Sequence, residues 1–418
     1  MAVRRNTVIV TEDTEKSVKP TGRRGRGKTQ DSNGARTSRR QGAAWKEKRE
    51  ITDQAGGVVA TLYLGDCRDV MGALGQSGVH AVVTDPPYEL EFMGAAWDRV
   101  NGPASNAATW QLAAAMLRPG GYVVSFAGSR TYHKIATAIE AADLEIRDQL
   151  MWLYGNGFPK SHDVAKAIDK ATGIWRGRAG AVKRHVSSRS FGAHYVTTKK
   201  GSAVTDAARE WDVWGTALRP AHEPIVLARK RFRGTVAANC MVRATGALNI
   251  SGCREGPWPA NVLCDGSAGV QLSLAAHSRG AAPWFYAPKA SRLEREAGLD
   301  VRGGASIAPR AAFDRGCARR SLNTHPTVKP VSVMRWLSRL VTAPSGVVLD
   351  PFMGSGTTGV AAACEGMKFV GIEQDARFFE LAQQRIAHAV RAVDEQPDLV
   401  RAIERAVAAA SESQTAMW

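Results

Sequence analysis

Two short motifs carry residue types that could do chemistry, and the first follows an apolar run over 79–84. It is Asp85-Pro86-Pro87-Tyr88. Two consecutive prolines fix φ and remove two backbone donors, so this turn offers only acceptors, the Asp85 carboxylate and the Pro86 carbonyl, beside the flat ring of Tyr88. Acceptors next to a stacking surface suit an exocyclic amino group on a planar base. A plain strand-ending turn is the alternative interpretation, because Asp and Pro favour turns.

The second motif also follows an apolar run and contains closely spaced glycines. Residues 350–359 are Asp-Pro-Phe-Met-Gly-Ser-Gly-Thr-Thr-Gly and open a predicted helix. Gly354 and Gly356 allow close backbone approach, and the helix N-terminus offers unpaired N–H groups. Glu373 stands 19 residues after Gly354, where an acidic side chain can bind both ribose hydroxyls. The pattern fits NAD or any adenosine-bearing cofactor, whereas a phosphate-binding loop would need a Gly-Lys-Ser/Thr that is missing here.

Both motifs lie in a sequence that alternates predicted strands with predicted helices. Short apolar or β-branched runs predict strands, and apolar residues at helical spacing predict helices. This alternation is typical of an open, mostly parallel sheet with helices on its faces. The strands are predicted over 61–64, 79–84, 122–126, 148–154, 225–228, 347–349 and 369–372, and the helices over 69–74, 110–117, 132–142, 331–341, 358–364 and 376–390.

The order of these elements is unusual for a dinucleotide-binding domain. After Glu373 the chain supplies one good helix and a tail over 393–418, which is too little to complete a six-stranded sheet. The missing strands lie earlier in the sequence, so the fold is predicted to be circularly permuted, with its cofactor half last. Asp85 and Gly354 would then face one crevice from neighbouring strands.

The charge of the chain is strongly positive and unevenly distributed. Its 418 residues contain 56 Lys and Arg against 39 Asp and Glu, a net charge of +17 that favours a polyanionic partner. Residues 1–50 carry 14 basic and 6 acidic side chains, and we expect a disordered basic arm there. Residues 160–240 carry 16 basic and 6 acidic side chains. For the arm, phosphate attraction and a merely solubilising role are both open.

The composition also argues against several classes of protein. No run reaches the roughly 18 apolar residues that a membrane span needs, and Val8, Ile9 and Val10 are too few for a signal peptide. We therefore expect a cytoplasmic protein. The six cysteines include no Cys-x-x-Cys pair, so neither a disulfide framework nor a thiolate zinc site is predicted. No other metal site is predicted.

Taken in order, the motifs resemble those of the β-class amino-group DNA methyltransferases, which use S-adenosylmethionine. Asp85-Pro-Pro-Tyr88 comes first, then a basic variable region, then Phe352-x-Gly354-x-Gly356. The resemblance covers roughly 61–160 and 323–390. The supporting matches are Leu64-Gly65-Asp66, Leu117-Arg118-Pro119-Gly120-Gly121, Gly157-Phe158-Pro159-Lys160, Glu223-Pro224 and His325-Pro326-Thr327-Val328-Lys329-Pro330.

The resemblance implies a circularly permuted Rossmann-like methyltransferase fold, an α/β fold with a mostly parallel doubly wound sheet and an inserted basic target-recognition region. Residues 51–160 would form the catalytic half and residues 323–392 the cofactor-binding half. Residues 161–322 would form the target-recognition region with some core strands, and residues 393–418 a C-terminal helix or tail. Within the recognition region the tryptophans are core residues by default, although Trp211 or Trp214 could touch DNA.

The catalytic residues implied by the resemblance are Asp85, Pro86, Pro87 and Tyr88. The Asp85 carboxylate and the Pro86 carbonyl would hold the target amine, so that its nitrogen can attack the methyl group. Tyr88 would stack on the base after it is flipped out of the helix. No covalent enzyme intermediate is needed, because alignment of the reacting groups carries the rate.

The resemblance also implies a set of residues that hold S-adenosylmethionine. Phe352 and the glycines would line its methionine and adenosine portions, Glu373 would bind its ribose, Asp66 its adenine edge and Lys329 its carboxylate. Asp66 as a helix cap and Lys329 as a solvated loop cation are the plainer alternatives. The predicted cofactor set is Asp66, Lys329, Asp350, Phe352, Gly354, Gly356, Thr357 and Glu373.

The predicted function is methylation of adenine N6 in duplex DNA, with cytosine N4 as the alternative. Methylation of cytosine carbon 5 would need a nucleophilic thiol in a Pro-Cys pair, and none of the cysteines follows a proline. An NAD-linked oxidoreductase and a non-catalytic DNA-binding protein on a methylase scaffold are the other hypotheses. Double-stranded DNA is the predicted partner, a cognate restriction endonuclease is a candidate partner, and the protein is expected to be a monomer or a homodimer.

Overall fold

The computed structural model describes residues 10–13, 44–91, 96–155, 157, 161–173, 203–254, 258–264, 285–286, 289–299 and 322–395. The chain divides into two compact units. The main unit consists of Met1–Tyr154 and His222–Trp418, and the small unit of Gly155–Ala221. Each unit is described by itself.

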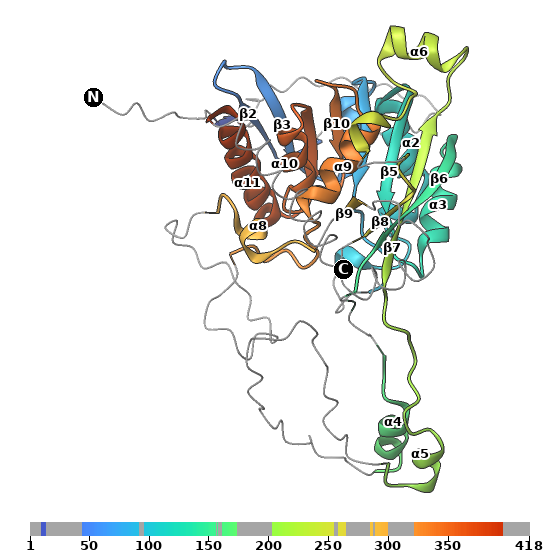
Figure 1. Ribbon diagram of the computed structural model, residues 1–418. Helices are drawn as coiled ribbons and strands as arrows, with labels where there is room; N and C mark the ends of the chain where they lie inside the picture. The colour runs from blue at the N-terminus through green and yellow to red at the C-terminus, as the bar shows by residue number, and fades with distance from the viewer. Residues whose placement is uncertain are drawn as a thin grey trace, which may run out of the picture. The chain divides into compact units, whose positions relative to one another are not determined.

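The main unit is built on one sheet, to which the described residues contribute eleven strands (Figure 1). Their spatial order is β1-β2-β3-β11-β10-β4-β5-β7-β6-β8-β9. The strands are β1 Val10–Asp13, β2 Glu47–Thr52, β3 Val58–Leu64, β4 Val79–Thr84, β5 Leu117–Phe126, β6 Leu144–Leu153, β7 His222–Lys230, β8 Val262–Cys264, β9 Phe285–Tyr286, β10 Val347–Asp350 and β11 Lys368–Glu373.

The topology confirms the predicted circular permutation. Strands β10 and β11 come from the C-terminal part of the chain but lie between β3 and β4, and all of these neighbours pair in parallel. Leu349 of β10 is in register with Val82 of β4. The carboxyl ends of β4 and β10 therefore meet at one edge of the sheet, where ligands bind in open α/β folds.

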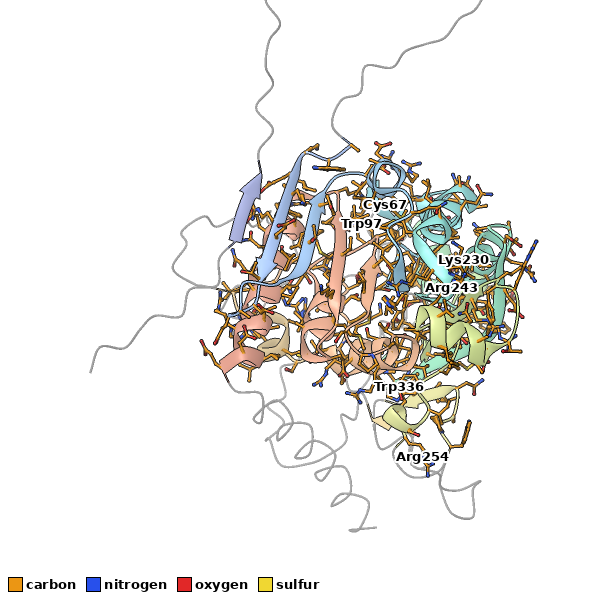
Figure 2. All side chains as sticks on the ribbon, turned by 90° about the horizontal axis from the view of Figure 1, so that it is seen from above. Cys67, Trp97, Lys230, Arg243, Arg254 and Trp336 are labelled. Carbon is orange, nitrogen blue, oxygen red and sulfur yellow. The ribbon has the colours of Figure 1, made fainter. Side chains whose placement is uncertain are left out.

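Helices cover both faces of this sheet. Apolar side chains of α1 Cys67–Leu74, α2 Ala107–Met116 and α3 Tyr132–Glu140 pack with one set of strand residues. Those of α9 Val331–Val341, α10 Thr357–Cys364 and α11 Ala376–Glu395 pack with the other set. Figure 2 shows Cys67 of α1 and Trp336 of α9 on opposite sides of the sheet. Because β4 is buried at every residue, it needed the continuous apolar run from which it was predicted.

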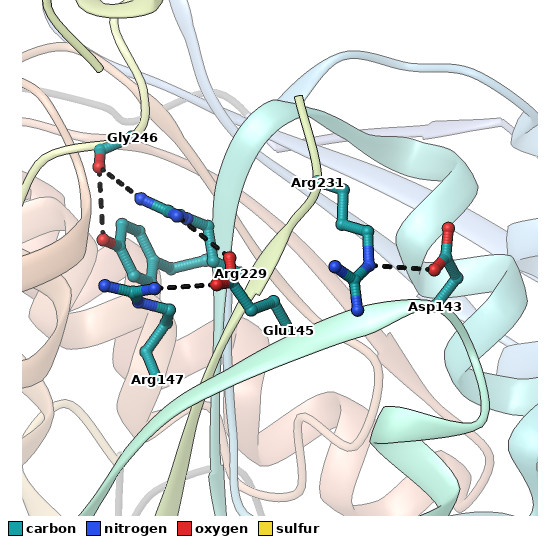
Figure 3. Close-up of polar contacts among 7 residues, drawn as sticks. Asp143, Glu145, Arg147, Arg229, Arg231 and Gly246 are labelled. Carbon is teal, nitrogen blue, oxygen red and sulfur yellow. Dashed lines mark hydrogen bonds and ion pairs between the residues drawn. The ribbon is translucent and has the colours of Figure 1, made fainter. Parts of the chain in front are cut away.

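Strand β7 is antiparallel to both of its neighbours, β5 and β6. Ion pairs fix its far end against β6: Arg229 Nη2 lies 2.9 Å from Glu145 Oε2, and Arg231 Nε lies 3.0 Å from Asp143 Oδ1 (Figure 3). Arg147 pairs with the second oxygen of Glu145 at 2.7 Å. These contacts hold the strand whose other end reaches the candidate site.

Several predicted boundaries differ from the structure, and two of them have a clear cause. The Arg118-Pro119-Gly120-Gly121 segment, expected to separate helix 110–117 from strand 122–126, lies within β5, because Leu117 already pairs with Val79 and a register shift with Gly120 at φ +84° accommodates the irregularity. Strand 225–228 extends to His222–Lys230, since its antiparallel partners are longer than the apolar run.

The expectation that residues 1–50 form a disordered arm was wrong for two segments. Strand β2 pairs with β3, and β1 pairs with β2. The buried Arg49 guanidinium is bonded to Glu380, 2.9 Å from Nη1 to Oε2, and Ile51 is fully buried. A half-buried strand needs only alternate side chains in the core, so its composition can be largely polar. The remaining arm residues and residues 396–418 lie outside the described part of the chain.

The small unit contains two short helices, α4 Val164–Ala171 and α5 Asp206–Glu210. The buried Asp169 carboxylate joins them by accepting hydrogen bonds from the Val204 and Thr205 amides, both at 3.1 Å. The apolar cluster between the helices is small, and consists of Ala165, Ala203 and Ala208 with Ile168 packed against it.

The other described helices are α6 Val236–Arg243 and α8 Arg292–Glu296. No helix in the described ranges combines the length and the apolar character needed to cross a membrane. The described cysteines are free thiols: Cys67, Cys240, Cys253, Cys264 and Cys364.

Candidate active site

The buried Asp350 carboxylate ties the ends of β4 and β10 together. Its Oδ1 accepts hydrogen bonds from the Thr84 hydroxyl at 2.6 Å and the Phe352 amide at 3.0 Å, and its Oδ2 accepts from the Thr358 hydroxyl at 2.5 Å. Burial raises the pKa of Asp350 to about 6, although these hydrogen bonds oppose the shift. Asp350 therefore fixes the position of the glycine-rich turn relative to the Asp85 turn.

The glycine-rich turn accepts only glycine at two positions. Gly354 has φ +54° and Gly356 has φ +81°. A Cβ on Gly354 would lie 2.8 Å from His325 Nε2, and a Cβ on Gly356 would lie 2.9 Å from the backbone of Ala382 in α11. Both the backbone conformation and the lack of space exclude larger residues. The turn thus brings bare backbone to the start of α10, which no side chain caps.

Glu373, at the end of β11, faces this turn. Its Oε2 accepts a hydrogen bond from the Gly354 amide and its Oε1 from the Asp375 amide, both at 2.8 Å. Burial raises the pKa of Glu373 to about 7. An ionised carboxylate has about four acceptor positions, so capacity remains for a hydroxyl group of a ligand. The geometry fits the predicted contact with a ribose.

A pocket opens between the two motif turns and the segment that precedes α9. It brings together Asp85 and much of the predicted cofactor set. Its lining is Asp85, His325, Thr327, Val328, Lys329, Met334, Asp350, Phe352, Met353, Gly354, Ser355, Thr357 and Thr358.

Asp85 lines this pocket, and its two carboxylate oxygens differ in that only one of them has a hydrogen-bond partner in the described part of the chain. Lys329 Nζ lies 2.6 Å from Asp85 Oδ2 and 3.2 Å from Glu223 Oε2. The Tyr88 hydroxyl donates to the same Glu223 oxygen at 2.9 Å. Asp85 Oδ1 is buried and has no hydrogen-bond partner among the described residues. A buried acceptor without a donor is costly unless a ligand satisfies it.

Burial and charge shape the protonation of this cluster. Burial raises the pKa of Asp85, Lys329 opposes the shift, and Glu223 adds to it. Burial by itself would lower the pKa of Lys329, but the carboxylates of Asp85 and Glu223 outweigh it and raise that pKa. Burial, with the same two carboxylates, raises the pKa of Tyr88 well above its usual value. Lys329 is therefore a cation at neutral pH, and Tyr88 is neutral.

Lys329 and Asp66 lie differently from what their predicted roles require. The Lys329 ammonium was expected to reach the carboxylate of the cofactor, but it is bonded to Asp85 and Glu223. Asp66 caps α1 by accepting from the Arg68 amide at 2.8 Å, and it forms an ion pair with the Arg68 guanidinium at 2.7 Å. Asp66 is not among the residues that line the pocket. Both residues have structural partners, and cofactor contact stays a prediction for each.

The other predicted residues support the pocket or lie next to it. Phe352 lines the pocket and packs on Trp110, with ring centroids 6.5 Å apart. The Thr357 hydroxyl, which also lines the pocket, accepts from Arg385 Nη1 at 3.2 Å. Pro86 is buried and Pro87 is half-buried in the turn that carries Asp85.

Several residues of the site were not in the predicted set, and three of them have contacts that give them a role. Glu223 completes the Asp85 cluster. Arg385 in α11 is buried and donates to the Ser355 carbonyl at 2.6 Å, which supports the glycine-rich turn. Burial and nearby cations lower the pKa of His325 to about 3, so its ring is neutral in the pocket. Only the Glu223-Pro224 and His325-Pro326 pairs offered a signal in the sequence, and nothing singled out Arg385.

An acceptor-lined turn thus lies beside a glycine-rich turn on a permuted α/β sheet. This arrangement suits an enzyme that transfers a group from a cofactor. The family model described as DNA methylase, for N6 and N4 methyltransferases, matches residues 79–384. The match covers most of the chain and includes both motifs. The chain belongs to the N6/N4 DNA methylase family.

Curated relatives match over shorter segments. A protein named as a methylase, YubD of Escherichia coli strain K12, is 44% identical over 71 residues, 17% of this chain and 31% of that protein. The type II methyltransferase M2.MboI of Moraxella bovis is 37% identical over 70 residues, 17% of this chain and 26% of that protein. The chain therefore matches less than a third of the length of these relatives.

Solved structures of methyltransferases are also similar to this chain. The crystal structure of M1.HpyAVI is 16% identical, with a TM-score of 0.39, over 78% of this chain and 98% of that one. The cytosine-N4-specific PvuII DNA methyltransferase is 13% identical, with a TM-score of 0.43, over 81% and 92%.

The cofactor of this family is S-adenosylmethionine, and the residues of the pocket fit it. Gly354, Ser355 and Thr357 line the pocket where α10 begins without a side-chain cap, and such a helix start suits ligand groups with negative charge. Phe352 offers an apolar wall of the pocket. Glu373 is not in the pocket lining but is bonded to Gly354, which is, so it lies beside the pocket where a ribose could reach it.

Proposed function

We propose that the protein transfers a methyl group from S-adenosylmethionine to an exocyclic amine in double-stranded DNA, and that the amine is N6 of adenine. The observation that carries the proposal is Asp85 Oδ1, a buried acceptor without a donor among the described residues, in a pocket shared with the glycine-rich turn. An exocyclic amine supplies the missing donor, and it is the group on which this family acts.

The roles of the residues follow from this geometry. S-adenosylmethionine, when bound, supplies a methyl group activated by its positively charged sulfur. The glycine-rich turn and Glu373 would hold its adenosine portion. Asp85 Oδ1 and the Pro86 carbonyl would accept the two N–H groups of the amine, which directs the nitrogen lone pair toward the methyl group. Tyr88 would support the flipped base by stacking.

The charge of the cluster suits this reaction. Asp85 and Glu223 are two carboxylates beside one ammonium, that of Lys329. The amine nitrogen becomes positive as its electron pair forms the new bond to carbon, and it then gives up a proton. A cluster with a net charge of −1 stabilises that developing positive charge. Asp85 Oδ1 is the acceptor positioned to receive the proton first.

Adenine N6 is proposed over cytosine N4 because Asp-Pro-Pro-Tyr leans toward adenine in this family. Both amines present the same two donors, so cytosine N4 is the second candidate. The NAD-linked alternative is not retained, because the family match covers both motifs of the site. A non-catalytic protein on this scaffold is the alternative that the assay below excludes or supports.

Target recognition is proposed for residues 161–322, which are basic and lie between the two motif regions. Arg and Lys contacts to phosphates should make binding of double-stranded DNA depend on salt, with a logarithmic slope near −0.9 per phosphate neutralised. A cognate restriction endonuclease is a proposed partner, because M2.MboI is named as a type II methyltransferase.

The test is transfer of labelled methyl groups from S-adenosylmethionine to unmethylated duplex DNA, followed by digestion and separation of the nucleosides. We expect label in N6-methyladenine. Label in N4-methylcytosine would replace the proposed base but keep the chemistry. DNA without label, together with retained binding of the cofactor and of DNA, would support the non-catalytic alternative.

A further inference from the structure

Glu223 reaches the active site from a strand that carries no catalytic motif. It lies near the start of β7, while Asp85 follows β4 and Lys329 precedes α9. Its Oε2 is 2.9 Å from the Tyr88 hydroxyl and 3.2 Å from Lys329 Nζ. Glu223 therefore joins the base-stacking residue to the cation that contacts Asp85, and it does so through one oxygen atom.

The Lys329 ammonium is held in a defined place on one side of Asp85. It contacts Oδ2 at 2.6 Å, and it lies over the rings of Phe126 and Tyr88, 4.8 and 5.2 Å from their centroids. The side chain of Lys329 is only 8% exposed. An ammonium group with a single carboxylate beside it could move between the two carboxylate oxygens, whereas a second carboxylate restrains it.

We propose that Glu223 is a positioning residue: by sharing the Lys329 ammonium, it confines this cation to Oδ2 of Asp85 and leaves Oδ1 open for the target amine. The same Glu223 oxygen accepts a hydrogen bond from the Tyr88 hydroxyl. Glu223 therefore aligns the ring of Tyr88, which would stack on the base, with Asp85 Oδ1, which would accept from the amine. The inference rests on the proposed methyl transfer, for which Asp85 Oδ1 is the acceptor. Lys329 is then a second positioning residue, which acts through Asp85.

The groups around Asp85 determine how its ionisation responds to substitution. Lys329 faces it from the segment before α9, Glu223 from β7, Tyr88 from its own turn and Asp350 from the end of β10. Tyr154, after β6, faces Glu223, and His325 lies near Lys329. Lys329 is the cation that opposes protonation of Asp85, and Glu223 is a like charge that favours it.

The first variant is Glu223→Gln, which keeps the shape of the side chain and removes its charge. Lys329 is then left with Asp85 as its one carboxylate partner in the cluster and competes with the amine for Asp85. We expect kcat at saturating cofactor to fall about 10- to 100-fold. The acid limb of the pH profile of kcat should move to lower pH, because a like charge beside Asp85 is gone.

The second variant is Lys329→Met, which should move the acid limb in the opposite direction. Without the ammonium, two carboxylates face each other in a buried site, so Asp85 should bind a proton more readily, and the acid limb should rise by about one pH unit or more. Adding Glu223→Gln to Lys329→Met removes the uncompensated charge. The double variant should therefore be more active than Lys329→Met alone, a rescue that independent structural damage would not give.

The matched control is Glu365→Gln in the same unit. The Glu365 carboxylate, like that of Glu223, has two side-chain partners, here the cations Arg335 at 2.8 Å and Arg339 at 2.6 Å. Its replacement should lower the midpoint of thermal unfolding and leave the acid limb in place. Glu373, whose pKa is about 7, acts on cofactor binding and so drops out of kcat at saturating cofactor. Asp350, whose pKa is about 6, is unchanged in all variants, so the limb that moves between them is assigned to Asp85.

The outcomes separate this inference from the proposed function. A wild-type protein that methylates no DNA contradicts the proposed function. An active wild type combined with an unshifted acid limb in folded Glu223→Gln contradicts the inference alone. Additive losses in the double variant contradict it as well. If Lys329→Met does not fold, the downward shift in Glu223→Gln still decides the question.

Discussion

The ends of β4 and β10 in the main unit differ from the Trp211–Trp214 turn in the small unit. At these strand ends the polar side chains that the structure describes are largely buried and bonded, down to the three donors around Asp350, and Asp85 Oδ1 is the exception. In the small unit, Trp211 and Trp214 are 44% and 59% exposed, and Val213 between them is 91% exposed with φ +64°. A β-branched residue rarely adopts a positive φ. The small unit thus holds apolar side chains in water at a strained turn.

This difference indicates which unit is expected to carry the chemical step and which is expected to bind DNA. Fixed, paired polar groups hold a reacting amine in one geometry, which suits the chemical step. Exposed apolar side chains gain free energy only when a partner covers them. We therefore expect substitutions in the main unit to change turnover or cofactor binding, and substitutions at the Trp211–Trp214 turn to change DNA binding. Four predictions test this division, and those with the greatest expected change come first.

The largest effect is expected from Asp85→Asn, which replaces one acceptor oxygen by a donor amide. Methyl transfer should fall by about 10²- to 10⁴-fold, because the amine loses its charged acceptor. The cofactor affinity, measured by calorimetry, should stay within about twofold, since Asp85 does not contact the glycine-rich turn. Loss of cofactor binding in the folded variant would mean that Asp85 has a structural role instead.

The next effect is expected from Gly354→Ala. The added Cβ would lie 2.8 Å from His325 Nε2 at a φ of +54°, so the turn must distort. The affinity for S-adenosylmethionine should fall about tenfold or more. The control is Gly366→Ala, at φ +65° with nothing within 4 Å of the added atom, which shares the backbone strain but not the clash. Equal losses in both variants would show that general destabilisation explains the result.

A smaller effect is expected from the double substitution Trp211→Ala and Trp214→Ala. DNA affinity should fall about tenfold, because contact with DNA would remove the exposed apolar surface of the two indole side chains from water. Cofactor affinity should not change. Met241→Ala in α6 of the main unit is the control, since Met241 is another apolar side chain with high exposure, 88%. DNA affinity that is insensitive to the tryptophans would contradict the proposed division.

The smallest effect is a pH dependence of cofactor binding. Glu373 has a pKa raised to about 7 by burial, and it accepts hydroxyl groups best when it is ionised. The affinity for S-adenosylmethionine should therefore rise severalfold from pH 6 to pH 8, and Glu373→Gln should flatten this rise. For the free protein the sign is opposite: stability is greatest below about pH 4.5 as far as Glu373 is concerned and declines as pH rises through 7.

The strands and helices around the site could be predicted from sequence because their signals are local. The run over 79–84 became β4 with the same bounds, and helix 331–341 became α9 with the same bounds. The position of Asp85 and Gly354 at one edge also followed, since parallel strands end together. The strand over 47–52 was missed, because its pairing with β3 and its burial of Ile51 depend on the tertiary fold.

The polar partners at the site could not be predicted from local patterns. Glu223 meets Tyr88 from 135 residues away in the sequence, through an antiparallel strand whose register is fixed by pairs such as Arg229 with Glu145. The Lys329 ammonium was predicted to bind the carboxylate of the cofactor, but it is paired with the carboxylates of Asp85 and Glu223. Sequence spacing shows which residues lie on one helix or strand. It does not show which side chains from three different segments pair with one ammonium group.

The central claim is that the open oxygen of Asp85 receives the target amine. The most direct test is a crystal structure of the protein with a non-reactive cofactor analogue and duplex DNA that contains its target. We expect the amine nitrogen about 2.7–3.2 Å from Asp85 Oδ1, with the Lys329 ammonium still bonded to Asp85 Oδ2 and to Glu223. An amine bound elsewhere, or a Lys329 that has moved to Oδ1 in the reactive complex, would contradict it.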